Sequence, residues 1–303
     1  MAKEKFQIEA GQAEFFAIES RTRDSWWEDF YQRRSFEPSA VSIFHIAARW
    51  DIPLLVDHVL SPKYTTTKVT ALFSLYVDSV HKDSFGRTPL AQCASLGHIE
   101  VFCLMLRRGG PMSDVEESVV STAVNNEKYG AEFLEALFNQ LGEQVTVTEG
   151  IVKAAAENEE SGAEVIKVLL DWKRDQVTVT EGIVTAAAGN RQSGAKVIKL
   201  LLDQKGDQVT VTENIIEAAA WNRQSGAEVM KLLLDRKGDQ VMVTEDIVKT
   251  TAENEESGAE VIKLLLDQKG DQVMVTEAIV RAAVENEEGG ARIVKALLDR
   301  KRE

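Results

Sequence analysis

The stretch that decides the fold is residues 145–176, VTVTEGIVKAAAENEESGAEVIKVLLDWKRDQ, because the chain copies it. The next 32 residues, 177–208, are identical to it at 24 of 32 positions. A more diverged copy precedes it at 113–144, and copies continue to residue 303, which makes six repeats. A fixed period of this length predicts a stack of structural units. The period is exact for one glutamine in five of the six repeats: Gln144, Gln176, Gln208, Gln240 and Gln272.

Each repeat has the pattern of two short helices. Thr148 is a predicted N-cap, and Glu149 follows at the positive end of the helix dipole. Apolar residues then recur at helical spacing, at Ile151, Val152, Ala155 and Ala156. Residues 157–162 break the pattern, and a second helix follows with Val165, Ile166, Leu169 and Leu170 before it ends within 171–175. Residues 176–179 form an extended link to the next repeat.

Helices this short must pack on their neighbours, because isolated helices below about 12–15 residues are marginal in water. We therefore predict an all-α solenoid of about eight or nine stacked helical hairpins, with an N-terminal helical cap. A β-solenoid built on the Val-Thr-Val-Thr link is the alternative. It is disfavoured because only four residues of each repeat have strand character.

Residues 83–110 carry a more specific pattern, with the opening D-x-x-G-x-T-P-L, the turn A-x-x-G-H and the helix E-V-x-x-L-x-L. This segment resembles one complete ankyrin repeat, and residues 42–60 resemble a second one weakly. The 32-residue repeats resemble ankyrin repeats only in their second helix, as at 163–170. The resemblance implies an ankyrin-like solenoid in which the usual β-hairpin finger is reduced to a short link.

Near-identical arrays of this kind are similar to those at the carboxyl ends of fungal nucleotide-binding receptors, where the array is thought to sense ligands. This chain has no phosphate-binding loop of the form G-x-x-x-x-G-K-S/T. The resemblance therefore implies that this chain corresponds to the recognition array of such receptors without their nucleotide-binding part. We divide the chain into three parts. Residues 1–40 are a helical cap or docking segment rich in aromatic residues. Residues 41–112 are the ankyrin-repeat region, and residues 113–303 are the six ankyrin-like repeats.

The net charge of −14 belongs entirely to the repeat array. Residues 1–110 carry 13 basic and 13 acidic side chains, which leaves 22 basic and 36 acidic side chains for residues 111–303. Nucleic acids and anionic membranes both require a basic surface, so neither is an expected partner. The first residues lack an apolar signal segment, which predicts a cytosolic protein. Two cysteines, Cys93 and Cys103, are too few for a disulfide framework or a zinc site.

Six copies in one chain allow an internal comparison of which positions vary. Three positions of the first helix change between repeats, and their spacings of three and four place them on one helical face. In an ankyrin-like array this face is concave. We predict that it binds a protein or a small ligand, and that the acidic array favours a basic partner. The predicted partner-binding residues are Lys153, Glu157, Thr185, Arg191, Glu217, Trp221, Arg223, Lys249, Glu253 and Arg281.

Trp221, Arg191 and Arg223 are the predicted anchor, since Trp and Arg dominate binding hot spots. The alternative is that exposed positions drift because nothing constrains them. The invariant Asn158 and Gly162 and their equivalents are assigned to the turn between helices, the asparagine through side-chain hydrogen bonds and the glycine through a positive φ.

Little in the sequence indicates catalysis, metal binding or a cofactor. His45 and His98 occupy positions where ankyrin repeats use histidine to bond turns, and His58 and His81 show no ligand spacing. Cys93 and Cys103 fit buried apolar roles. The alternative function is a biosynthetic or hydrolytic enzyme that uses the solenoid groove, with acid–base candidates only in the N-terminal region: Glu28, Asp29, His45 and Asp57. A purely structural or homo-oligomeric role is a third option.

Overall fold

The structure, a computed structural model, describes residues 43–59, 82–83, 85–108 and 117–300. The predicted cap at 1–40, with Glu28 and Asp29, lies outside the described residues, as does His81. The chain divides into two compact segments, Met1–Thr146 and Val147–Glu303, which are described separately. The described residues form sixteen α-helices and no strand, so the chain there is all-helical and the β-solenoid alternative is wrong.

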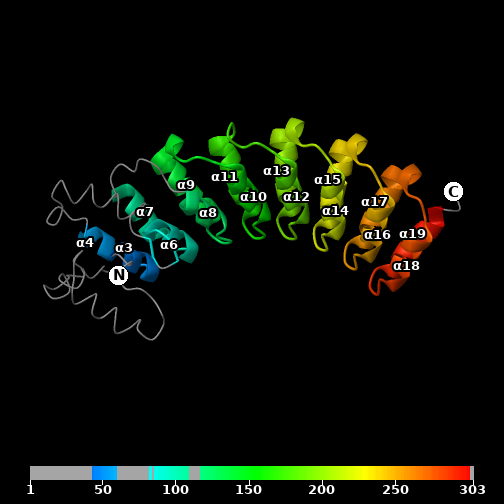
Figure 1. The fold of residues 1–303 in the computed structure, drawn as a ribbon, viewed down its shortest axis with the longest axis horizontal. Coiled ribbons are helices and arrows are strands. Elements are labelled where there is room, and N and C mark those ends of the chain that lie inside the picture. The colour runs from blue at the N-terminus through cyan, green and yellow to red at the C-terminus, as the bar shows by residue number, and fades with distance from the viewer. Residues whose placement is uncertain (1–42, 60–81, 84, 109–116, 301–303) are drawn as a thin grey trace, which may run out of the picture. The chain divides into compact units, whose positions relative to one another are not determined.

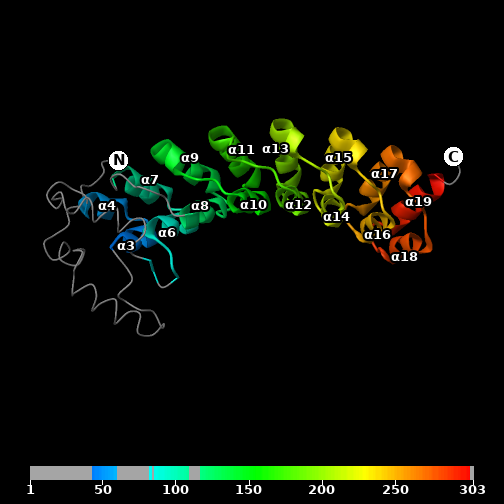
Figure 2. The same cartoon turned by 45° about the horizontal axis from the view of Figure 1, so that its top comes forward.

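The C-terminal segment consists of five helix pairs stacked in two layers (Figure 1). Within each layer a helix packs on its equivalent in the next repeat, so that α10 contacts α12 and α11 contacts α13. Figure 2 separates the layer of first helices from the layer of second helices. The first helices are α10 (Glu149–Glu157), α12 (Glu181–Gly189), α14 (Glu213–Trp221), α16 (Glu245–Glu253) and α18 (Glu277–Glu285). The second helices are α11 (Gly162–Lys173), α13 (Gly194–Lys205), α15 (Gly226–Lys237), α17 (Gly258–Lys269) and α19 (Gly290–Arg300).

The helix boundaries follow the capping and apolar signals of the sequence. Thr148 lies just before α10 in extended conformation, and its Oγ1 accepts a hydrogen bond from the Ile151 N–H. The four predicted apolar residues of α10 are all buried. Short 3-10 turns end several second helices, at η3 (Gly206–Gln208), η4 (Gly238–Gln240) and η5 (Gly270–Gln272). The link that follows is extended, with Val177 and Val179 buried and Thr178 exposed.

The N-terminal segment contains three described helix pairs and a final 3-10 turn. They are α3 (Ile43–Trp50) with α4 (Pro53–Val59), α6 (Pro89–Leu96) with α7 (Ile99–Arg108), and α8 (Glu117–Val124) with α9 (Gly130–Leu141), followed by η2 (Gly142–Gln144). Thr88 caps α6, with Pro89 as its first residue, and Gly97 ends α6 at a φ of +80°. That positive φ is a conformation that glycine adopts without a steric penalty.

His45 and His98 of this segment bond backbone carbonyls, and its two cysteines are free. The His45 Nε2 lies 3.0 Å from the Arg87 carbonyl oxygen, and the His98 Nδ1 lies 2.6 Å from that of Ala48. Both side chains therefore bond backbone, as predicted. Cys93 is fully buried, whereas Cys103 is only half-buried, and both are free thiols. Burial raises the pKa of both cysteines, most strongly for Cys93.

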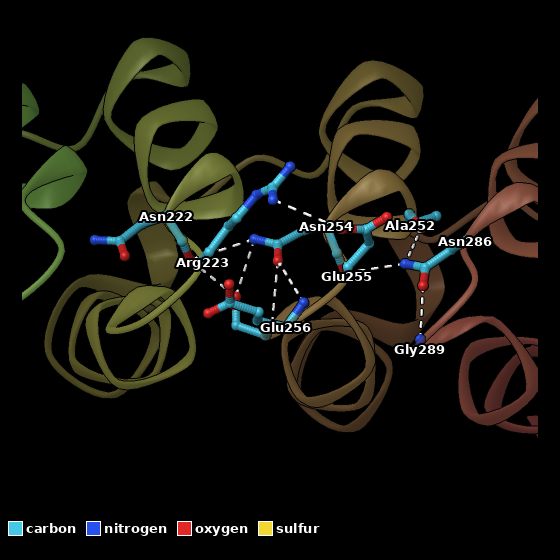
Figure 3. A network of polar contacts seen from close by, with 9 residues as sticks. Asn222, Arg223, Ala252, Asn254, Glu255, Glu256, Asn286 and Gly289 are labelled. Atoms are coloured by element: carbon cyan, nitrogen blue, oxygen red, sulfur yellow. Dashed lines mark hydrogen bonds and ion pairs between the residues drawn. The ribbon is translucent and has the colours of Figure 1, made fainter.

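An asparagine ladder joins the turns between the helices of successive repeats. The Asn254 side chain lies between Asn222 and Asn286 of the neighbouring turns (Figure 3). Its Nδ2 donates to the Ala220 carbonyl at 2.8 Å, and its Oδ1 accepts from the backbone of its own turn. Each member thus satisfies backbone groups of two repeats. In the C-terminal segment, four asparagines donate in this way to a carbonyl of the preceding repeat: Asn190, Asn222, Asn254 and Asn286.

The invariant glycine that begins each second helix has a different role from the predicted one. The positive φ values of described glycines occur at Gly86, Gly97 and Gly142, and Gly162 is not among them. Instead, a Cβ atom on Gly162 would lie 2.6 Å from the Ala155 carbonyl oxygen. The glycine is therefore required because the two helices of a repeat approach closely, and the expectation of a left-handed conformation is wrong.

Two further side-chain contacts recur along the array, one between repeats and one within a repeat. The Thr180 hydroxyl donates to Glu149 of the preceding repeat at 2.7 Å, and the same bond recurs from Thr212, Thr244 and Thr276. The Gln176 Oε1 accepts from the Val147 N–H at 2.9 Å, which joins the two ends of one repeat. Among the described residues, no helix is both long and apolar enough to cross a bilayer.

Candidate functional site

The first-helix face is the surface formed by the exposed side chains of α10, α12, α14, α16 and α18 together with their turns. Nine of the ten predicted partner-binding residues are exposed on it, and Thr185 is half-buried. The apolar residues of the same helices turn inward, so the periodicity separates the two sets as the sequence predicts. The predicted set therefore shares one surface of the C-terminal segment.

Charged side chains on this face pair with one another. Lys153 lies 3.7 Å from Glu157, Lys249 lies 3.6 Å from Glu253, and Arg281 lies 2.8 Å from Glu277, each one turn apart on its helix. Arg223 reaches Glu255 of the next repeat at 3.6 Å (Figure 3). Exposed pairs of this kind contribute little to stability, so a partner can replace them at small cost.

A groove opens in this face at α12. Its volume is about 590 Å³, and it is lined by α10, α12 and α14. Gly182, Ala186 and Gly189 of α12 line it, and the repeats with a complete first helix carry Glu or Trp at the position of Gly189. A Cβ atom on Gly189 would meet no atom within 4 Å. Core packing therefore does not require this glycine, and its small size is what hollows the surface.

The walls of the groove are mostly acidic and polar. Glu157 and Glu159 come from the α10 side, together with Lys153, while Glu181 and Asn214 close the other side. The Thr212 hydroxyl and the Asn214 amide both donate to the Glu181 carboxylate, at 2.7 and 2.9 Å. These two hydrogen bonds lower the pKa of Glu181. The groove thus holds an ionised carboxylate in a fixed position.

Trp221 lies apart from this groove, at the end of α14. Half of its surface is exposed, at 50 %, although most large apolar residues of α14 are fully buried. Arg191 and Arg223 occupy the same position in consecutive turns and are exposed. The structure therefore leaves the three predicted anchor residues accessible on neighbouring repeats.

The candidate acid–base and metal-binding side chains of the described residues are dispersed or bonded to neighbours. No cluster of three or more His, Cys, Asp or Glu side chains within them could hold a metal ion. His45 is buried against the Arg87 carbonyl, and Asp57 pairs with Arg108 at 3.0 Å. These two acid–base candidates of the enzyme alternative therefore have structural partners.

Sequence reasoning missed the groove and the glutamate position that binds threonine in four repeats. The groove coincides with the repeat that has only small residues at the variable positions of its first helix. Gly182, Thr185 and Gly189 of α12 are together the smallest trio of the five complete repeats. That signal was available in the sequence.

Five segments of the chain match the model of a family described as a domain of unknown function (DUF7104): residues 137–165, 168–197, 200–230, 232–261 and 264–293. Each match begins in a second helix, passes through the link and the next first helix, and ends in the following second helix. The chain is similar to this family across its tandem repeats. A comparison with curated proteins found no match.

Proposed function

We propose that this chain is a non-catalytic recognition scaffold that binds a protein with a basic surface on the first-helix face. The observation that carries the proposal is the contrast between fixed and variable positions. Residues that vary between repeats are exposed on one face, whereas Asn222, Gly226 and their equivalents are held by packing or hydrogen bonds. Extended faces of this kind are the usual binding surfaces of repeat proteins.

The groove at α12 is the proposed entry point for a basic side chain. Glu157, Glu159 and Glu181 face it from both sides, and Lys153 is already paired with Glu157. A lysine or arginine of the partner would therefore meet uncompensated carboxylates. The array's excess of acidic side chains would steer such a partner toward it, and steering raises the association rate more than the affinity.

Trp221, at the end of α14 and apart from this groove, is the proposed aromatic anchor. Its exposed ring can accept a cation over its face, and such contacts favour Lys and Arg. Arg223 is neutralised by Glu255, so it does not oppose a basic partner. Together these residues supply the aromatic and arginine chemistry of a binding hot spot.

We also infer that the array is ankyrin-like, which would make the first-helix face the concave one. Thr88-Pro89 at the start of α6, Gly97 at its end and the His98 bond to backbone support this inference. The tandem helix pairs of the later repeats are compatible with it.

The test uses a random peptide display library and a labelled peptide of alternating arginine and alanine. We expect selection on the intact chain to enrich Lys and Arg, and the labelled peptide to bind in a salt-sensitive manner. Filling the groove with Gly182→Gln and Gly189→Gln should weaken binding at least about tenfold at unchanged melting temperature. Gly206→Gln is the matched control, because a Cβ atom there also meets open space but lies outside the groove.

A second set of variants tests the anchor. Replacing Trp221, Arg191 and Arg223 together by alanine should abolish binding and leave the melting temperature nearly unchanged. Equal loss of fold and binding would assign these residues to the core. Enrichment of acidic peptides, or binding that survives the filled groove, would refute the proposed surface.

A further inference from the structure

The first residue of every first helix in the C-terminal segment is an exposed glutamate. The members of this glutamate row are Glu149, Glu181, Glu213, Glu245 and Glu277. For the first four, the threonine that precedes the next first helix donates to the Oε1 atom, at 2.7–3.0 Å. Because the same bond recurs, these four carboxylates share one orientation and are spaced by one repeat.

The first four carboxylates of the glutamate row are not neutralised by the described part of the chain. No Lys, Arg or His side chain of the described residues pairs with them, and none of these residues donates to their second oxygen, Oε2. Other carboxylates of the face do have cationic partners, since Glu277 pairs with Arg281 and Glu157 with Lys153. The row therefore presents four free oxygens at a constant spacing.

The groove at α12 shows in which direction a partner can lie. It reaches from Lys153 of α10 across α12 to Asn214 of α14, and Glu181 of the row lines it. Packed helices are about 8–10 Å apart, so the groove extends over about 16–20 Å along the array. A chain bound in it therefore crosses the first helices and follows the glutamate row.

The width of the groove limits the conformation of that chain. Dividing the volume of about 590 Å³ by the length gives a mean cross-section of about 30–37 Å². An α-helix, with a diameter of about 10–12 Å, has a cross-section of about 80–110 Å² and does not fit within it. The groove therefore favours a single extended chain.

The spacing of the row selects between two extended conformations. In a β-strand, side chains on one face recur every two residues, at about 6.6–6.8 Å, which is shorter than the helix spacing of about 8–10 Å. In a polyproline II helix, side chains recur on one face every three residues, at about 9.3 Å. A polyproline II segment therefore presents one side chain to each repeat of the array.

Resting on the function proposed above, we propose that the occupant of this face is a segment of the partner protein in polyproline II conformation, with a lysine or arginine at every third position. Each cation meets the Oε2 atom of one glutamate of the row. The small residues Gly182, Ala186 and Gly189 leave room in the groove for the intervening residues of the segment. Four successive triplets, about twelve residues, occupy the four free carboxylates.

Three labelled peptides test the period of three. Each carries four lysines, separated by one, two or three prolines, so that charge and conformation are shared and the spacing differs. Fluorescence anisotropy with the full chain at about 0.15 M salt, where the Debye length is about 8 Å, measures their affinities. We expect the peptide with two prolines between lysines to bind at least about tenfold more tightly than the other two.

The outcomes separate this inference from the proposed function. Equal affinities, or a preference for another spacing, overturn the period of three but leave recognition of a basic partner standing. If none of the three peptides binds while the display library enriches Lys and Arg, the inference alone is overturned. If there is neither binding nor enrichment, both are overturned.

Charge removal tests whether the glutamate row makes the contact. Glu181→Gln with Glu213→Gln should abolish the preference for the two-proline peptide, because two successive cations lose their carboxylates while the threonines can still donate to the amide oxygens. The matched control is Glu228→Gln with Glu260→Gln, which removes the same charge from exposed positions of second helices and should leave the preference unchanged. Thermal melting followed by circular dichroism checks that both variants fold. A preference that survives the first pair, or that both pairs reduce equally, overturns the proposal.

Discussion

Replacing Asn222 by alanine tests the contribution of the asparagine ladder to stability. The Asn222 Nδ2 donates to Ala188, Asn190 and Ser225 at 2.8–2.9 Å, and its Oδ1 accepts from two backbone N–H groups of its own turn. The side chain is buried, so water does not readily replace these hydrogen bonds. Alanine would remove the partner of the Ala188 carbonyl in the preceding repeat and of the Gln224 and Ser225 N–H groups.

The magnitude follows from the bonds lost. The Nδ2 group has two protons, so its three contacts count as two bonds, and with the two bonds to Oδ1 the four correspond to about 2–6 kcal/mol at about 0.5–1.5 kcal/mol each. The Ser225 hydroxyl also donates to the Asn190 carbonyl, so that acceptor keeps a partner. We therefore expect a loss of about 3–4 kcal/mol in the free energy of unfolding. Urea unfolding followed by circular dichroism measures it, with the exposed Gln224→Ala as the control.

Asn222→Asp sharpens the same test because it is nearly isosteric. The aspartate keeps the accepting oxygen but turns a second oxygen toward the Ala188 and Asn190 carbonyls, which repels them. At neutral pH it should destabilise at least as much as alanine, and acidification should recover part of the loss because a protonated carboxyl can donate. A loss below about 1 kcal/mol for Asn222→Ala, the worth of one ordinary bond, would refute the reasoning.

Three other outcomes are expected. Gly226→Ala should lower the melting temperature because its Cβ atom would lie 2.5 Å from a backbone carbonyl, whereas Gly238→Ala, which meets open space, should not. Asn214→Ala should raise the pKa of Glu181 toward its ordinary value in an NMR titration, since one of two stabilising donors is removed. With a folded-state pKa below the unfolded one, the Glu181 contribution to stability is present above the unfolded pKa and is lost as pH falls through the folded pKa. The buried Cys93 thiol should react with a thiol reagent only on unfolding, and the half-exposed second cysteine should react first.

The helices were predictable because local signals and tertiary packing agree. Thr148 has the residue type of an N-cap, and the apolar spacing after it matches a helix that must bury one face. The same periodicity placed Trp221 on the opposite, exposed face. Each of these inferences uses residues that are close in the sequence.

The interactions that sequence reasoning missed connect residues about one repeat apart. The Gln176 bond to Val147 spans 29 residues, and the Thr180 bond to Glu149 spans 31. An invariant residue signals that something is required, but its partner depends on how the repeats are stacked. Gly162 shows the same difficulty, because a close helix approach and a positive φ favour the same residue type.

The ladder also gives the array a polarity. Each asparagine amide reaches back to carbonyls of the preceding turn, as Asn190 does to Ala156 and Asn158. Removing repeats from the C-terminal (trailing) end leaves all remaining amides paired. Removing repeats from the N-terminal (leading) end removes the carbonyl acceptors of the first asparagine amide that remains. Natural variants of such arrays should therefore gain and lose copies mainly at their trailing end.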